Sequence, residues 1–247
     1  TILCDTDENS DKEAAYLKLL VQRRVDGIII APTTNDKNRL ALLKHHQVPC
    51  VLIDRRVEGF KADIVYDDTR AGAHMLINHL ISLGHRSIAL INGPRSISTA
   101  YDRGEGYCDA LQEHQIPIDD HLIFEGSFKQ DSGYQLVKQL LAQSPRPTAI
   151  FAANNFIALG ALQALREAGL RIPDDMALVC IDDVPAALVT EPLLTVVAQP
   201  AYDMGKTAAR LLIERITTKR NVKPRKVVLV PHLIVRRSCG QELFNES

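Results

Sequence analysis

The stretch "ALVCIDDVPAA" at residues 177–187 indicates most directly how this chain folds. Its first five residues are apolar, which is typical of a strand buried on both faces of a parallel sheet. Two adjacent carboxylates, Asp182 and Asp183, follow the apolar run, and Pro185 breaks the element. Because ligands of α/β proteins bind beyond the carboxyl ends of parallel strands, a buried strand that ends in acids raises the question of a binding site.

Short apolar runs like this one alternate with helical patterns along the whole chain. Strands are predicted over residues 1–5, 27–32, 48–54, 63–68, 87–94, 122–126, 148–154 and 176–183, with two extended pieces over 225–238 that Pro231 separates. Helices are predicted from residue 10 and over 36–46, 69–84, 99–113, 155–170 and 201–218. Strands separated by crossover helices predict an α/β fold with parallel sheets covered on both faces. There are more strands than one compact doubly wound sheet usually holds, which favours two lobes.

Local signals mark several helix ends. The first helix is expected to open with a capping box between Ser10 and Glu13. Gly84 and Gly169 stand where the third and fifth predicted helices should stop, as glycine often does at helix C-termini.

The composition excludes several classes of protein. The 247 residues carry a net charge of -1, with 46% hydrophobic and 24% charged residues, which is typical of a globular protein. The sequence has no cluster of basic residues of the kind that binds nucleic acid without regard to its sequence. No apolar run approaches the ~20 residues that span a bilayer. The chain also opens without the pattern of a secretory signal.

The five cysteines are scattered and the eight histidines form no metal-binding pattern. Without a CxxC motif or a Cys/His cluster, the sequence predicts reduced thiols in a cytoplasmic protein and no structural metal. No motif indicates a cofactor.

Polar side chains gather at the predicted carboxyl ends of the strands: Asp54, Asp67, Asp68, Asn92, Asn154, Asn155, Asp182 and Asp183. Two interpretations compete for them. In the first, the side chains face a ligand in a crevice. In the second, each side chain caps the helix that follows and stabilises it by ~1 kcal/mol. Capping is favoured for Asp68 and Asn155, and is less convincing for Asp182 because no helix follows at once.

An enzyme is disfavoured. Adjacent strand residues point to opposite faces, so Asp182 and Asp183 cannot act as one dyad. The chain has no GxSxG elbow, Walker loop or GxGxxG turn. A binding protein fits better, because carboxylates, an arginine and an aromatic ring are what a sugar needs. Arg103 and Phe128 are the candidates for the last two roles.

Eight motifs in order resemble one family. They are "RRVDGIIIAPT", "VPCVLIDR", "GHRSIALINGP", "RGEGYCDAL", "GSFKQDSGYQ", the long block "PTAIFAANNFIALGALQALREAGLRIPDDMALVCIDDVP", "LTVVAQPAYDMGKTAARLL" and "LIVRRSC". They cover nearly the whole chain and are similar to those of the LacI/GalR family of bacterial transcription regulators. The long block and the "RRS" ending favour these regulators over their periplasmic sugar-binding relatives, which remain the alternative function.

The resemblance implies a periplasmic-binding-protein type I fold of two Rossmann-like lobes with a small-molecule cleft between them. The N-terminal lobe is expected over 1–67 plus 200–228, and the C-terminal lobe over 68–199 plus 229–247. Members are dimers or tetramers that bind operator DNA through a helix-turn-helix headpiece, which is expected to be absent from this chain, and no membrane is expected as a partner. The first strand and helix of the N-terminal lobe are also expected to be missing. A gap in the sheet, or an edge covered in another way, and marginal stability should follow, because an unpaired apolar edge is a liability.

The resemblance also implies a set of ligand-binding residues: Arg103, Asp182, Phe128, Asp54, Asn154, Thr99 and Ile97. Arg103 and Asp182 would contact the effector, Phe128 matches an aromatic position, and Thr99 and Ile97 match positions that vary with specificity. Purine-responsive members carry a basic residue at the position of Ile97. Isoleucine there argues against an anionic purine and for a neutral sugar.

Overall fold

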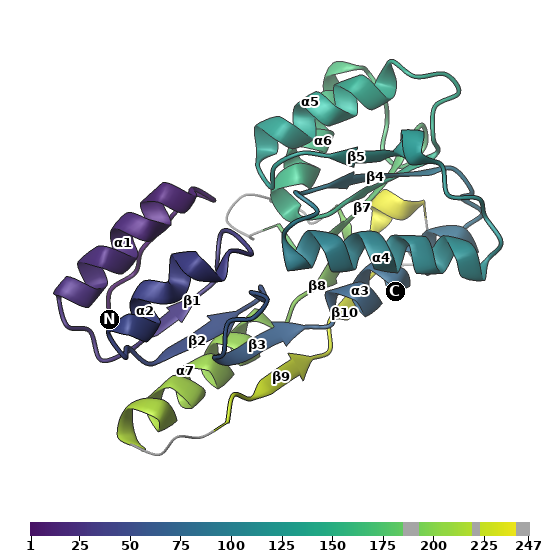
Figure 1. Ribbon diagram of the computed structural model, residues 1–247. Coiled ribbons are helices and arrows are strands. Elements are labelled where there is room, and N and C mark those ends of the chain that lie inside the picture. Colours follow the sequence, from purple (N-terminus) through teal and green to yellow (C-terminus); the bar gives the residue numbers. More distant parts are fainter. Residues whose placement is uncertain (185–192, 219–222, 241–247) are drawn as a thin grey trace, which may run out of the picture. The chain divides into compact units, whose positions relative to one another are not determined.

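The computed structural model describes residues 1–184, 193–218 and 223–240. Contacts within the chain divide it into two compact units, each with its own sheet. Unit 1 comprises Thr1–Asp68, Ser96–Thr99 and Pro200–Val230, and unit 2 comprises Thr69–Arg95, Ala100–Gln199 and the chain from Pro231. The prediction of an α/β fold built on two mainly parallel sheets is confirmed (Figure 1).

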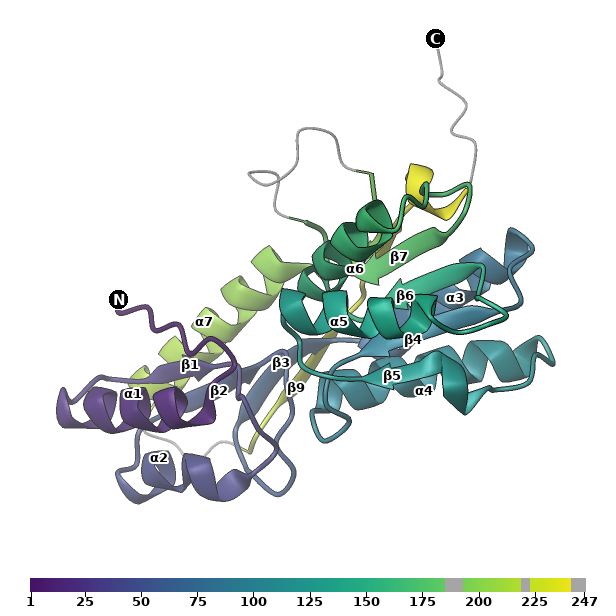
Figure 2. The same ribbon diagram turned by 90° about the horizontal axis from the view of Figure 1, so that it is seen from above.

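Unit 1 is a three-layer sandwich around four parallel strands. In sheet order these are β1 (Ile28–Ile30), β2 (Cys50–Ile53), β3 (Asp63–Asp67) and β9 (Lys226–Leu229). One face packs against α1 (Ser10–Gln22), η1 (Lys37–Leu40) and α2 (Ala41–His45), and the other against α7 (Ala201–Thr217) (Figure 2). Because side chains alternate along a strand, Val51 faces α7 while Leu52 faces α1 and α2.

Unit 2 is a larger sandwich around six strands. In sheet order these are β10 (His232–Ile234), β8 (Thr195–Ala198), β7 (Ala177–Ile181), β6 (Ala149–Ala152), β4 (Ile88–Asn92) and β5 (Ile123–Glu125). The helices are α3 (Thr69–Ser82), α4 (Ser98–Glu113), α5 (Gln130–Leu141) and α6 (Asn155–Glu167), with η2 (Asp120–Leu122) and η4 (Arg237–Cys239). The strands are parallel except β10, which pairs antiparallel with β8.

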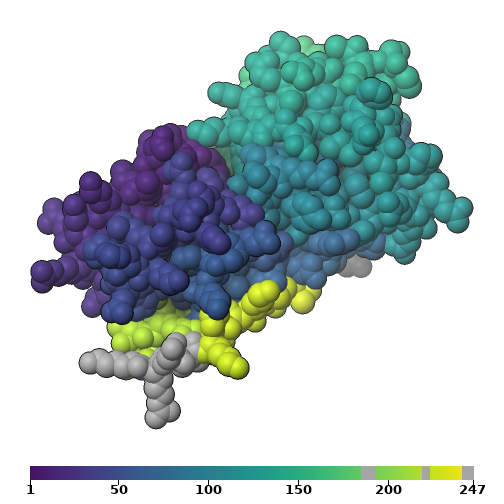
Figure 3. Space-filling view, in the orientation of Figure 1, coloured from purple at the N-terminus to yellow at the C-terminus, as the bar shows by residue number. Residues whose placement is uncertain are grey.

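Two pairs of helices cover the faces of this sheet. The main apolar core lies under α3 and α4, where Leu76 and Tyr107 pack on Leu90 and Phe151. Helices α5 and α6 lie side by side over the other face (Figures 1 and 2). In the space-filling view, yellow atoms of the stretch that includes β9 lie at the surface of unit 1 (Figure 3).

The helix ends confirm some local predictions and correct others. Gly84 and Gly169 follow the last turns of α3 and α6 with positive φ of 96° and 71°, as expected of helix-ending glycines. The capping box at Ser10 is wrong, because the side chain of Asn9 caps α1 by accepting from the N–H groups of Asp11 and Lys12. Glu13 is instead 2% exposed and accepts from Thr33 N at 2.7 Å, which ties α1 to the loop after β1.

Three other elements differ from the sequence predictions. Helix α5 and strand β8 were not predicted, because α5 opens with polar residues and contains Gly133, and β8 is only four residues long. The strand predicted over residues 1–5 is absent, since this segment runs as irregular chain with no strand to pair with.

The segment of residues 1–6 instead lines a groove beside the outer edge of β1. Within the described residues β1 pairs only with β2, so its other edge is open, as expected. The groove encloses about 860 Å³, and apolar side chains of α1, β1 and α7 line it. Ile29 and Ile213 there are 40% and 60% exposed.

We expect this edge to promote aggregation, because an exposed apolar edge offers unpaired N–H and C=O groups to other chains. Ile29→Lys should reduce aggregation on mild heating, since a charge at an edge strand opposes strand pairing. Light scattering during a temperature ramp measures the effect. Ile118→Lys, at a similarly exposed isoleucine in unit 2, is the matched control, and equal scattering from both variants would contradict the prediction.

The remaining fold-level observations concern thiols and membranes. All five cysteines are free, and Cys180 and Cys239 are buried. Burial raises the pKa of the Cys180 thiol well above its usual value, which leaves it unreactive. Among the described residues, no helix is long and apolar enough to cross a bilayer.

Candidate functional site

Three neighbouring strands of unit 2 carry polar residues to one edge of the sheet. Strands β4, β6 and β7 are adjacent and parallel. Asn92 is the last residue of β4, Asn154 lies two residues beyond β6, and Asp182 directly follows β7. The carboxyl ends of parallel strands therefore place all three at the edge where α/β proteins bind ligands.

Arg103 is the most deeply buried charged residue of this edge. It lies on α4 and is 3% exposed. Its Nε donates to Thr69 Oγ1 at 3.0 Å and its Nη1 donates to the carbonyl of Ala153 at 2.7 Å. These bonds fix the plane of the guanidinium and leave Nη2 directed toward Asp182, 3.9 Å from Oδ2. At this distance the two charges attract without a direct hydrogen bond.

Asp182 has a backbone conformation unusual for a residue with a side chain. Its φ is 66°, in the left-handed region that aspartate tolerates better than most residues. Its N–H still donates to Val197 O at 2.9 Å, so the strand pairing continues while the side chain turns away. The carboxylate is 29% exposed and can accept hydrogen bonds from a ligand. Backbone strain of this kind is concentrated at functional sites.

Asp54 repeats this geometry in unit 1. It follows β2, has a φ of 66°, and its N–H donates to Val65 O at 2.9 Å. In each unit, a parallel strand is thus followed directly by an aspartate with a left-handed backbone conformation.

Asn154 and Phe128 are joined to each other. Asn154 Oδ1 accepts from Ile157 N at 2.8 Å, which caps α6, and Nδ2 donates to the carbonyl of Phe128 at 3.1 Å. Asn154, rather than the predicted Asn155, therefore caps this helix. Asn155 donates to the carbonyl of Asp183 at 3.0 Å.

The ring of Phe128 is 5% exposed and lies against Gly93. A Cβ at position 93 would clash with the ring of Phe128, so the ring in this position needs glycine there. Asn92 supports the same turn, because its Oδ1 accepts from Gly93 N and its Nδ2 donates to Ala100 O, both at 2.9 Å.

Asp183 has a separate, structural role. Its carboxylate accepts two hydrogen bonds from Arg236, at 2.8 and 2.6 Å, and one from Val184 N at 2.9 Å. The Arg236 guanidinium holds the pKa of Asp183 below its usual value. The bond to Val184 N supports the local backbone, and the pair with Arg236 links the end of β7 to the C-terminal segment.

Three further candidate residues belong to unit 1: Asp54, Ile97 and Thr99. Ile97 and Thr99 are 6% and 3% exposed. Thr99 Oγ1 is buried and has no hydrogen-bond partner among the described residues. A buried hydroxyl normally has a hydrogen-bond partner, so Thr99 Oγ1 is one of a few exceptions in the described parts of the chain.

The structure thus brings Arg103 together with Asp182, and Asn154 together with Phe128, on unit 2. Sequence reasoning missed Thr69, Gly93 and the carbonyl of Ala153, which position these side chains. No sequence signal marks a backbone carbonyl as an arginine acceptor. In the described parts of the chain, no group of three or more His, Cys, Asp or Glu side chains is arranged to hold a metal.

Comparison with known proteins identifies the family of this chain. Residues 77–239 match the model of the periplasmic binding protein-like domain. The HTH-type transcriptional repressor PurR of Yersinia pestis (strain Pestoides F) is 35% identical over 247 residues, which is 99% of this chain and 72% of the repressor. The chain belongs to the LacI family of transcriptional regulators. Among these regulators it corresponds to the effector-binding domain.

Two solved structures extend the comparison. The transcriptional regulator CelR in complex with cellobiose is 34% identical with a TM-score of 0.83, over 92% of this chain and 70% of CelR. A LacI family regulator from Enterococcus faecium with bound ribose is 32% identical with a TM-score of 0.82, over 96% of this chain and 86% of that one. These LacI-family relatives are regulators, which favours a regulator over a transporter's sugar-binding protein or an enzyme.

Proposed function

We propose that this LacI-family domain binds a neutral sugar or related polyol at the edge formed by β4, β6 and β7. One observation carries the proposal: the buried Arg103 is held by Thr69 and Ala153 so that its free Nη2 faces the part-exposed carboxylate of Asp182. Together these two residues offer a fixed donor and a fixed acceptor. Vicinal hydroxyls need such a pair, because each hydroxyl both donates and accepts.

Other features support a neutral ligand. Ile97 is buried and apolar, whereas an anionic purine is expected to require a basic residue at this position. The relatives solved with cellobiose and with ribose are consistent with a sugar.

The proposed consequence of binding is a shift between two conformations in a cytoplasmic homodimer or tetramer. A sugar bound at this edge, with Asp54, Thr99 and Ile97 as further proposed contacts, would stabilise one of the two conformations. In the complete regulator this change would alter operator binding by the DNA-binding headpiece. The sugar must bind the favoured state more tightly, since equal affinity would shift nothing.

Calorimetric titration with ribose, cellobiose and hypoxanthine tests the ligand class. We expect a sugar to bind and hypoxanthine not to bind. A thermal-shift screen over a wider set of sugars extends this test, with ~2.7 kcal/mol of stabilisation expected at a hundredfold excess over Kd. Tight binding of hypoxanthine with no response to any sugar would contradict the proposed ligand class.

Asp182→Asn tests the proposed acceptor. The variant should bind the sugar about 10- to 100-fold more weakly, because a hydrogen bond to a charged group contributes ~1.5–3 kcal/mol. Asp174→Asn is the matched control, since Asp174 is exposed on the turn before β7. If Asp182→Asn bound the sugar as tightly as the control, Asp182 would not be part of the site.

A further inference from the structure

Unit 1 contains a cavity at the opposite end of its sheet from Asp54. The cavity encloses about 650 Å³. Cys50 and Asp63, the first residues of β2 and β3, both line it, whereas Asp54 follows the last residue of β2. The cavity therefore lies at the amino ends of these strands, whereas Asp54 lies at their carboxyl ends.

The charges that line this cavity are unbalanced. The lining residues include four cations, Lys37, Lys44, Lys61 and Arg215, and a single carboxylate, Asp63. Arg215 already binds that carboxylate at 2.7 and 2.9 Å. Among the described residues, no carboxylate lies within ion-pair distance of the three lysines.

The carboxylate of Asp63 cannot compensate these lysines because other groups saturate it. Besides Arg215, it accepts from Arg225 Nη2 at 3.0 Å and from Arg225 N at 2.8 Å. The lysines therefore leave a positive potential over the cavity, which an anion would relieve.

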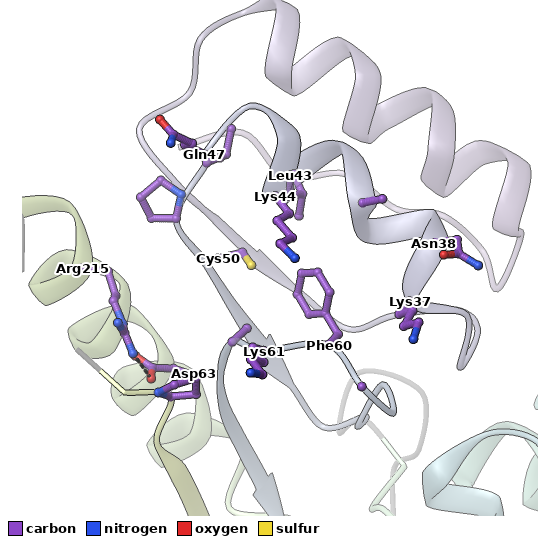
Figure 4. Close-up of a pocket in the computed structure, with 16 residues that line it drawn as sticks. Lys37, Asn38, Leu43, Lys44, Gln47, Cys50, Phe60, Lys61, Asp63 and Arg215 are labelled. Carbon is purple, nitrogen blue, oxygen red and sulfur yellow. Dashed lines mark hydrogen bonds and ion pairs between the residues drawn. The ribbon is translucent and has the colours of Figure 1, made fainter. Parts of the chain in front are cut away.

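An aromatic ring lies among these cations. Phe60 is half-buried in the turn before β3. In Figure 4 the side chain of Lys44 extends toward the ring of Phe60, and Lys37 and Lys61 lie to either side of it. Leu43 of α2 and Cys50 of β2 add apolar wall. Burial raises the pKa of the Cys50 thiol to about 11, so this wall stays uncharged.

We propose that this cavity is a second small-molecule site, which takes a phosphate monoester with an apolar or aromatic body. The phosphate binds the lysines, which act as mobile point charges. The body packs against Phe60. Such a site would give the regulator a second signal besides its sugar, and the inference does not depend on the identity of that sugar.

Calorimetric titration at low ionic strength tests this site with three probes. Phenyl phosphate carries both the anion and the ring, inorganic phosphate only the anion, and phenol only the ring. We expect phenyl phosphate to bind more tightly than inorganic phosphate, and phenol to give no measurable binding. Added salt should weaken binding, because exposed charges are screened. Absence of phenyl phosphate binding by the unmodified protein would overturn the proposal.

Two lysine variants locate the binding. Lys44→Gln and Lys61→Gln should each weaken phenyl phosphate binding about threefold or more, in line with exposed ion pairs. Phe60→Leu should weaken phenyl phosphate but not inorganic phosphate. Lys206→Gln, at an exposed lysine of α7 outside the cavity, is the matched control. Equal affinity in Lys44→Gln, Lys61→Gln and the control overturns the proposal.

Arg103→Met separates this site from the sugar site. We expect the variant to keep the affinity of the unmodified protein for phenyl phosphate while it loses the sugar. Loss of phenyl phosphate binding in Arg103→Met would place the anion at Arg103 and overturn the cavity proposal. Failure of the sugar proposal leaves the result with phenyl phosphate unchanged, so the two failures are distinguishable.

Discussion

Arg103→Met should weaken binding of the cognate sugar at least about 100-fold. The substitution removes a donor aimed at the ligand, and each hydrogen bond to a charged group contributes ~1.5–3 kcal/mol. It also removes the charge that faces Asp182, so that this acceptor is less firmly placed. The free energy of unfolding should fall by ~1–3 kcal/mol, because the buried carbonyl of Ala153 loses its partner. Calorimetric titration and chemical denaturation measure the two effects.

Arg70→Met is the matched control for this substitution. Arg70 also binds a carboxylate, that of Asp109 at 2.7 Å, but both side chains are exposed on the outer faces of α3 and α4. Removing an exposed pair typically changes stability by less than about 1 kcal/mol, and sugar affinity should not change. Sugar binding by Arg103→Met equal to that of Arg70→Met would exclude Arg103 from the site.

Thr69→Val distinguishes positioning from direct contact. It removes only the hydroxyl that accepts from Arg103 Nε. If Thr69 acts by orienting the guanidinium, sugar affinity should fall about tenfold while the charge of Arg103 remains. An unchanged affinity would show that the bond to Ala153 O alone holds the side chain.

These residues also show how far the sequence could lead to the site. Apolar runs between helical patterns predicted nearly all strands, because a strand buried on both faces must be continuously apolar. The acids and amides at the strand ends followed from that assignment. The identity of the partners did not follow, since Thr69 and Ala153 contact Arg103 across 34 and 50 residues of sequence. Neither residue type indicates such a contact.

Asn154 and Asp183 illustrate a second limit. An asparagine or aspartate at a strand end suits a ligand, a helix cap or an ion pair equally well. Asn154 caps α6 and Asp183 binds Arg236, which lies 53 residues away. Only the three-dimensional arrangement separates these roles. The left-handed conformation shared by Asp54 and Asp182 was equally invisible, because aspartate occurs at many ordinary turns.

Asp63→Asn should lower the free energy of unfolding at neutral pH by about 3 kcal/mol. The carboxylate is fully buried and binds both Arg215 and Arg225, so neutralising it leaves two guanidinium groups without their partner. Burial alone would raise the pKa of Asp63, but the hydrogen bonds from Arg215 and Arg225 outweigh it and lower the pKa to about 2. Chemical denaturation followed by far-UV circular dichroism measures the difference.

The pH dependence of this difference gives the sharper test. A carboxylate whose pKa is lower in the folded state stabilises the fold fully above its unfolded pKa of about 4, and the stabilisation is lost as pH falls toward about 2. The stability gap between the unmodified protein and Asp63→Asn should therefore be constant above about pH 4 and narrow below it. Asp109→Asn, which removes an exposed carboxylate bound to Arg70, should show a gap below about 1 kcal/mol throughout. A gap for Asp63→Asn that persisted unchanged to pH 2 would mean that the loss arises from packing rather than from the charge of Asp63.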